Sequence, residues 1–119
     1  MSKKILVVED SKLVHRMYDL MLKPHTIVHC YDGHDALQQL ADHHDTDAVL
    51  LDLNMPRMSG LELLAHLRKD PVFSKIPVII VSTEGKEEDT RRGLEAGATA
   101  YVTKPFQRED ILDVLSRVT

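Results

Sequence analysis

The stretch Ala48–Pro56, which reads Ala-Val-Leu-Leu-Asp-Leu-Asn-Met-Pro, decides the fold. Four apolar residues lead directly into Asp52, and Pro56 ends the run. An unbroken apolar run between such breakers predicts a strand buried on both faces, which is typical of parallel sheets covered by helices. A carboxylate just past that strand lies at the carboxyl edge of the sheet, where open α/β sheets bind ligands. Taken alone, Asp52 is equally well explained as a residue that caps a turn.

The composition is that of a globular chain, with 119 residues, 43% hydrophobic residues, 29% charged residues and a net charge of −4. This length predicts a single domain over residues 1–119 with a core of its own. A weakly acidic chain without a basic stripe is a poor nucleic-acid binder, and its apolar runs are too short for a signal peptide or a membrane span. Cys30 is the only cysteine, which excludes an internal disulfide and suits a reducing, cytoplasmic location.

Four further segments have strand character, and each of the five strands is followed by a segment with helical spacing of apolar residues. The further strands are expected at Ile5–Val8, Thr26–Tyr31, Val78–Val81 and Ala98–Thr103. Strict alternation of strands and helices predicts a parallel sheet with helices on both faces. The second strand is the least apolar and is expected at an edge. The predicted fold is therefore a flavodoxin-like, doubly wound five-stranded sheet with strand order 2-1-3-4-5.

Local signals delimit the helices. We read Asp32-Gly33 as a turn before the second helix, and Ser59 as the N-cap of the third, with Glu62 completing a capping box. Gly97 is a natural C-cap glycine for the fourth helix. In the first helix we expect one apolar stripe to face the core, formed by Leu13, Val14, Met17, Leu20 and Met21.

Polar side chains follow several of the predicted strands. In the predicted order the first and third strands are neighbours, so Glu9, Asp10 and Asp52 converge. Clustered carboxylates raise one another's pKa values unless a cation lies between them, and a sparse set of oxygen ligands favours Mg²⁺. Ser82 and Lys104 follow the fourth and fifth strands. A nucleophilic carboxylate, a metal site, a hydroxyl and a lysine together suit phosphoryl transfer.

Each of these residues also has an ordinary explanation. Glu9-Asp10 alone fits a solvated strand end, Ser82 alone fits a helix N-cap, and Lys104 alone fits a surface lysine. Several independent strand ends that point to the same edge make a shared functional site the better explanation.

Several segments, in order along nearly the whole chain, match a single family. They are Val8-Glu9-Asp10, Leu51–Pro56, Met58–Glu62, Ser82, Gly97-Ala98 and Tyr101–Phe106. On these residues the chain resembles the response-regulator receiver domains of two-component signalling, and it is most similar to the single-domain chemotaxis type.

The resemblance implies a metal-dependent phosphoacceptor site. Asp52 would take a phosphoryl group from the phosphohistidine of a sensor histidine kinase or phosphotransfer protein. Asp10, Asp52 and the backbone carbonyl of Asn54 would bind Mg²⁺ directly, and Glu9 would act through water. The protein would be a signalling switch that catalyses only its own phosphorylation and dephosphorylation, with a downstream effector protein as its other partner and without contact to nucleic acid or membrane.

The resemblance also implies a switch. Ser82 and Lys104 would bind phosphoryl oxygens, Tyr101 would change rotamer as Ser82 moves inward, and the bond from Lys104 to Pro105 would be cis. The surface that changes would be formed by the helix Lys86–Ala96, which has very little apolar surface and should be held weakly, together with Tyr101 and Gln107–Val118.

Three positions are expected to tune dephosphorylation. Thr83 stands where the family usually has Ala or Gly, and its branched side chain would restrict access to the phosphoryl group. Asn54 and Glu84 occupy the positions two after the acceptor and two after the hydroxyl residue. Their pairing resembles the chemotaxis type and implies a short-lived phosphoryl group.

Other functions fit the residues less well. Aspartyl phosphatases of the haloacid-dehalogenase type carry their nucleophile after the first strand with a second Asp two residues on, whereas here Asp52 follows the third strand and Asn54 takes that position. In a flavin-binding module, Glu9-Asp10 would repel the phosphate. A receiver domain cut from a longer transcription factor remains an alternative. The seven histidines lack the spacing of a metal site.

Overall fold

The computed structural model describes residues 2–53, 58–83 and 87–119. Its strands form one sheet in the order β2-β1-β3-β4-β5 with every neighbouring pair parallel, which confirms the predicted flavodoxin-like topology. The strands are β1 (Lys4–Val8), β2 (Thr26–Cys30), β3 (Ala48–Leu51), β4 (Val78–Ser82) and β5 (Ala100–Thr103).

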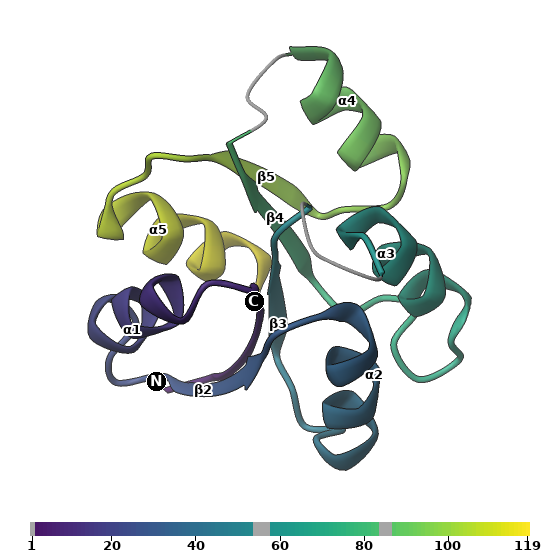
Figure 1. Ribbon diagram of the computed structural model, residues 1–119, viewed down its shortest axis with the longest axis horizontal. Helices are drawn as coiled ribbons and strands as arrows, with labels where there is room; N and C mark the ends of the chain where they lie inside the picture. The colour runs from purple at the N-terminus through teal and green to yellow at the C-terminus, as the bar shows by residue number, and fades with distance from the viewer. Residues whose placement is uncertain (1, 54–57, 84–86) are drawn as a thin grey trace.

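Helices cover both faces of this sheet (Figure 1). One hydrophobic cluster joins one face of the sheet to α1 and α5, and a second cluster joins the other face to α2 and α3. The fourth helix, α4, contacts β5 on the same face as α2 and α3. The helices are α1 (Lys12–Met21), α2 (Gly33–Asp42), α3 (Gly60–Lys69), α4 (Glu87–Glu95) and α5 (Arg108–Val118).

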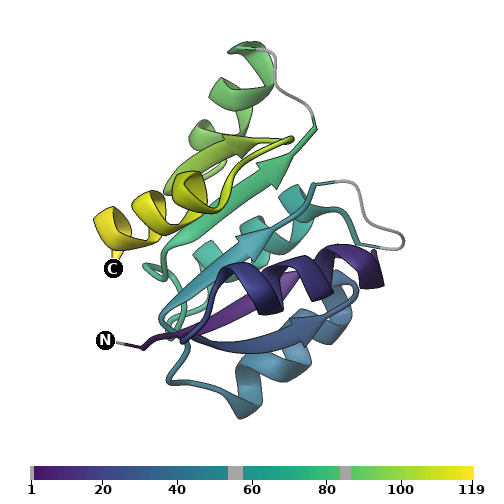
Figure 2. The ribbon, with the colours of Figure 1, turned by 90° about the vertical axis from the view of Figure 1, so that its left-hand side faces the viewer.

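The register of the sheet brings the carboxyl ends of the central strands to one edge. Val8 pairs with Leu51, and Leu51 pairs with Ile80. In Figure 2 the strand arrowheads point to the right, and both marked chain ends lie at the left, beyond the opposite edge of the sheet. β3 and β4 are buried along their whole length, as expected for central parallel strands. Whatever residues follow the central strands therefore lie side by side.

The helix starts agree only in part with the sequence-based expectations. Ser59 is the N-cap of α3, and its hydroxyl accepts a hydrogen bond from the Glu62 backbone N–H at 3.2 Å, as predicted. The expected turn at Asp32-Gly33 is wrong, because Gly33 is the first residue of α2. The Asp32 carboxylate caps that helix by accepting from the Asp35 N–H at 2.8 Å.

The expected core stripe of α1 is confirmed for Val14 and Met21, which pack against the core, and is wrong for its other three residues. Leu13, Met17 and Leu20 are 68%, 42% and 71% exposed, whereas His15 and Tyr18 are the buried residues of this helix. The helix is thus turned about its axis relative to the prediction. Tyr18 stacks on Phe106, with ring centroids 5.9 Å apart, which couples α1 to the segment that leads into α5.

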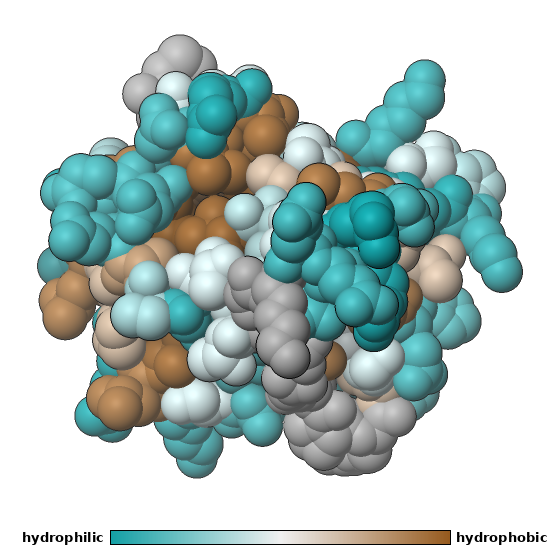
Figure 3. All heavy atoms as spheres, turned by 90° about the horizontal axis from the view of Figure 1, so that it is seen from above, coloured by the Kyte–Doolittle hydropathy of each residue, from teal (hydrophilic) through white to brown (hydrophobic). Residues whose placement is uncertain are grey.

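The fourth helix is held by little apolar contact, as the sequence predicted. Gly93 is its only buried residue, and Leu94 is 44% exposed. A Cβ atom at Gly93 would lie 2.8 Å from the Cδ1 atom of Ile80 and 3.1 Å from the Cδ2 atom of Tyr101, so a larger residue would require these side chains to shift. Figure 3, which looks down on this end of the molecule, shows mainly hydrophilic side chains with apolar surface exposed between them.

The C-terminal end of α4 is fixed more firmly. Gly97 has a φ of 110°, the left-handed conformation expected of a C-cap glycine. The Arg68 guanidinium donates from Nε to the Gly97 carbonyl at 2.9 Å and from Nη1 to the Ile76 carbonyl at 2.8 Å. One side chain of α3 therefore ties the α3–β4 segment to the α4–β5 turn. Among the helices that the structure describes, none is long and apolar enough to cross a membrane.

The revised orientation of α1 predicts that two neighbouring leucines contribute very differently to the stability of the fold. Leu22, directly after α1, is 0% exposed, whereas Leu20 is 71% exposed. We expect Leu22→Ala to lower the free energy of unfolding by about 2–5 kcal/mol because it leaves a cavity. Leu20→Ala, the matched control, should change it by no more than about 0.5 kcal/mol. Urea denaturation of both variants measures this, and equal losses would show that α1 faces the core as the sequence first indicated.

Candidate functional site

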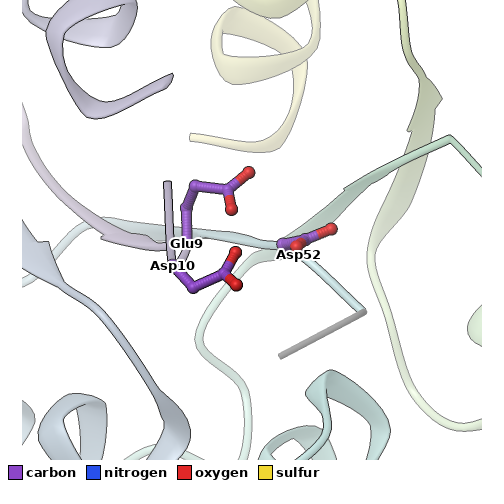
Figure 4. A group of neighbouring side chains, drawn as sticks. All are labelled: Glu9, Asp10 and Asp52. Carbon is purple, nitrogen blue, oxygen red and sulfur yellow. The ribbon is translucent and has the colours of Figure 1, made fainter. Parts of the chain in front are cut away.

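Three carboxylates meet at the carboxyl edge of the sheet. Glu9 and Asp10 directly follow β1, and Asp52 directly follows β3. One oxygen from each carboxylate lies within 4.8 Å of the other two (Figure 4). Glu9 is 4% and Asp52 is 8% exposed, whereas Asp10 is exposed to solvent. The site therefore has two sheltered carboxylates and one at its mouth.

Backbone pairing fixes these positions. The Asp52 N–H donates to the Val8 carbonyl at 3.0 Å, which continues the β1–β3 pairing one residue beyond the strands. In the same way, the Lys104 N–H donates to the Ser82 carbonyl at 2.8 Å beyond β4 and β5. The sheet itself, rather than a flexible loop, therefore delivers these residues to the site.

The Lys104 ammonium is the basic group of the site. Its Nζ atom lies 2.8 Å from Oε1 of Glu9 and 3.9 Å from Oδ1 of Asp52. The other oxygen of Glu9 accepts a hydrogen bond from the Ser11 backbone N–H at 3.2 Å. A carboxylate as buried as Glu9 is strongly disfavoured without such partners. Lys104 thus compensates part of the negative charge gathered at the edge.

The pKa values of the two adjacent acids, Glu9 and Asp10, shift in opposite directions. Burial raises the pKa of Glu9, but hydrogen bonds from Lys104, Asp10 and the Ser11 backbone together outweigh burial and hold that pKa below its usual value. The pKa of Asp10 is raised, chiefly by its hydrogen bond with Glu9 and then by burial and the Glu9 charge. Burial and the charges of Glu9 and Asp52 also raise the pKa of the Tyr18 phenol. Negative charge is therefore in excess at this edge.

These residues suit a hard divalent cation. The cluster offers only carboxylate oxygens, which are the ligands that Mg²⁺ and Ca²⁺ prefer. Three clustered side chains leave room for water, and partial hydration favours Mg²⁺. The position of Asp10 at the exposed mouth gives an ion a route to the two sheltered carboxylates. The donor set therefore fits the cofactor that the sequence predicted.

Other predicted site residues surround this cluster. Ser82 is the last residue of β4 and is 0% exposed. Thr83, next along the chain, is exposed, and the peptide bond from Lys104 to Pro105 is cis. Beside them lies a mainly apolar pocket of about 360 Å³, lined by Val14, Met17, Thr83, Lys104, Pro105 and Phe106.

Tyr101 lies further from the carboxylates. It is partly buried and packs against the hydrophobic cluster beneath α4, next to Gly93. The structure therefore gathers Glu9, Asp10, Asp52 and Lys104 at the edge and leaves Tyr101 at the α4 interface. Asn54 and Glu84 lie outside the described residues.

Sequence reasoning missed the buried face of α1 that lies against the site. His15, Tyr18 and Leu22 follow the i, i+3, i+7 spacing of a helix stripe. That spacing could have identified the face, but histidine was counted as polar. His15 is only 3% exposed, and its Nε2 atom lies 2.7 Å from the Glu9 carbonyl oxygen.

Comparisons of the sequence and the structure with known proteins point to a single family. The family described as "Response regulator receiver domain" matches residues 5–116. The chain is 36% identical over 114 residues to the Escherichia coli phosphate regulon transcriptional regulatory protein PhoB, covering 94% of this chain but 49% of PhoB, and so spans about half the length of that relative. It is 33% identical to the Helicobacter pylori chemotaxis protein CheY1, covering 97% of this chain and 95% of CheY1. The structure of the Vibrio cholerae chemotaxis protein CheY4 has a TM-score of 0.91 and 30% identity, with complete coverage of both chains.

The excess of negative charge predicts that removing one charge stabilises the metal-free protein. Asp10→Asn keeps the shape of the side chain and relieves its repulsion with Glu9, so its melting temperature in EDTA should exceed that of the parent protein. Asp42→Asn, which removes an exposed carboxylate at the end of α2, should leave the melting temperature almost unchanged. Calorimetry of the three proteins measures this. An unchanged or lower melting temperature for Asp10→Asn would mean that the carboxylates do not repel one another in the folded state.

Proposed function

Because this chain belongs to the response regulator receiver domain family, we propose that it is a phosphorylation-controlled signalling switch in which Asp52 is the phosphoacceptor. The phosphoryl group comes from the phosphohistidine of a sensor histidine kinase or a phosphotransfer protein, in a Mg²⁺-dependent reaction. The single observation that carries the proposal is the convergence of Glu9, Asp10 and Asp52 with the Lys104 ammonium at one sheet edge.

Asp52 acts as the nucleophile. One of its carboxylate oxygens forms the new bond to phosphorus while the bond from phosphorus to the donor imidazole nitrogen breaks, and the imidazole departs with that electron pair. Asp10, Asp52 and the backbone carbonyl of Asn54 would hold Mg²⁺ directly, and Glu9 would act through water. When bound, the ion supplies neutralisation of the charge on the transferred group.

Lys104 and Ser82 receive the phosphoryl oxygens. The Lys104 Nζ atom lies 3.9 Å from Asp52 Oδ1, so a short movement brings it to an oxygen attached there. Its present partner, Glu9, would then be released from the 2.8 Å contact and would be available to act on the metal through water. The Ser82 hydroxyl, at the end of the adjacent strand, donates to another phosphoryl oxygen.

The surface next to the site suits the approach of a protein donor. The apolar pocket beside Lys104 is lined on one side by Val14 and Met17 of α1, and Met17 is 42% exposed. A phosphohistidine that reaches Asp52 belongs to a protein, whose surface would then contact the residues around this pocket. Apolar surface beside Lys104 supports a protein, rather than a free small molecule, as the donor.

Phosphorylation of Asp52 is tested with a small phosphodonor. Incubation with acetyl phosphate and Mg²⁺ should add one phosphoryl group by intact-mass measurement, and neutral hydroxylamine should remove it because the adduct is an acyl phosphate. Asp52→Asn should add none, whereas the control Asp42→Asn should behave as the parent protein does. Replacing Mg²⁺ with EDTA should abolish the gain. A phosphoryl adduct on Asp52→Asn would contradict the assignment.

Phosphorylation is proposed to change the surface formed by α4, Tyr101 and α5. Drawing the Ser82 hydroxyl toward a phosphoryl oxygen vacates space behind it, and the Tyr101 ring can turn into that space. The α4 helix contacts this ring through Gly93, its only buried residue, so few apolar contacts oppose a shift. A small movement at the site then alters the face that a downstream effector binds, provided that both arrangements are close in energy.

The lifetime of the phosphoryl group would depend on Thr83, Asn54 and Glu84. The exposed Thr83 side chain lines the pocket beside Lys104, where its bulk limits the approach of water or a partner.

Relatives of similar length and relatives about twice as long both match. A receiver domain within a longer transcription factor is thus the second candidate, and the full-length gene decides between the two.

The switch predicts a specific pattern of spectral changes. Adding Mg²⁺ and beryllofluoride, a phosphoryl mimic, should shift amide NMR resonances in residues 87–95 and near Tyr101. Ser82→Ala should suppress these remote shifts while those around Glu9 and Asp52 persist, because the mimic still binds. Shifts confined to the residues around the carboxylates, or remote shifts unchanged in Ser82→Ala, would refute the coupling.

A further inference from the structure

A buried histidine contacts the backbone of the acidic site. The Nε2 atom of His15, on α1, lies 2.7 Å from the carbonyl oxygen of Glu9, and His15 is 3% exposed. A backbone carbonyl can only accept a hydrogen bond, so Nε2 carries the hydrogen and donates it. This carbonyl belongs to the peptide unit that joins Glu9 to Asp10, the two adjacent carboxylates of the cluster.

The second nitrogen of the His15 ring is also engaged. Its Nδ1 atom lies 2.6 Å from Nδ1 of His29 on β2, and Nε2 of His29 lies 2.9 Å from Oδ1 of Asp19. The two rings meet edge to face, with centroids 4.7 Å apart, and the Tyr31 ring packs against His15 at 4.4 Å. Contacts from β2, from the segment after β2 and from the Glu9 carbonyl therefore fix the orientation of the His15 imidazole.

Both backbone groups of Glu9 are thus held by other elements. Its N–H donates to the Cys30 carbonyl at 3.0 Å, and its carbonyl accepts from His15. Beyond this point the chain leaves the sheet, and Asp10 is exposed. A rotation of the peptide unit between the two acids would swing the Asp10 carboxylate away from Asp52, and repulsion among the carboxylates favours such a rotation.

We propose that His15 is a positioning residue of the metal site, which holds the peptide between Glu9 and Asp10 so that the carboxylates of Asp10 and Asp52 face one ion. The inference rests on the proposed function, because it concerns the same Mg²⁺ site. Residues that orient metal ligands from behind typically contribute a tenfold or larger factor to metal affinity. A histidine that merely fills the core would contribute to stability but not to metal affinity.

Two substitutions separate positioning from packing. His15→Phe retains an aromatic ring of similar size and removes the donor, whereas His15→Gln places an amide N–H at similar reach. We expect the dissociation constant for Mg²⁺, measured by titration, to rise at least about tenfold in His15→Phe. In His15→Gln it should stay close to the parent value. In the metal-free state the Asp10 amide resonance should move in His15→Phe and return toward its parent position in His15→Gln.

Each outcome bears on the proposal. Parental Mg²⁺ affinity in His15→Phe would overturn it, whatever the melting temperature, as would equal losses in both variants. If His15→Phe does not fold, imidazole ¹⁵N spectra of the unmodified protein decide, because a hydrogen-free Nε2 on His15 would overturn the proposal and a protonated Nε2 coupled to the Glu9 carbonyl would support it. Failure of the unmodified protein to bind Mg²⁺ would overturn the metal site itself. If the unmodified protein binds Mg²⁺ and is phosphorylated, but His15→Phe keeps the parental Mg²⁺ affinity, only this inference is overturned and the proposed function stands.

Discussion

Parallel pairing of the central strands in one register is the constraint on which the site depends. Because β1 and β3 end level with one another, and β4 runs on beside them to Ser82, the residues that follow these strands emerge at the same edge. Acids after β1 and β3 are thereby brought within 4.8 Å although they repel one another. The lysine that offsets this repulsion comes from beyond β5, 95 residues after Glu9. Core burial thus provides the free energy that holds an electrostatically unfavourable edge together.

The sequence was sufficient for the sheet order and for the acidic cluster, because both follow from apolar runs and from the residue directly after each run. It was not sufficient for the facing of α1. A histidine becomes a core residue only when its nitrogens find partners, and those of His15 lie on β2 and on the Glu9 backbone. Likewise, the pairing of Lys104 with Glu9 needs the relative position of the first and fifth units, which no local pattern contains.

The helices differ in how firmly they are held against the sheet. α1 and α5 share the cluster with the buried Tyr18, and α2 and α3 bury several large side chains in the opposite cluster. α4 buries one glycine. The molecule is therefore well packed around its acidic edge and loosely packed at one adjoining helix, where the fewest apolar contacts would oppose a movement.

The hydrogen bonds of Arg68 determine what form such a response takes. They tie the turn after α4, at Gly97, to the α3–β4 segment, while Gly93 is the only residue that the helix itself buries. If α4 moves in the proposed switch, this anchor at its C-terminal turn favours rotation over sliding, with the smallest displacement at Glu95 and the greatest at Glu87. The pivot would then be Arg68, a side chain that donates to backbone carbonyls outside α4 and is not part of the acidic cluster.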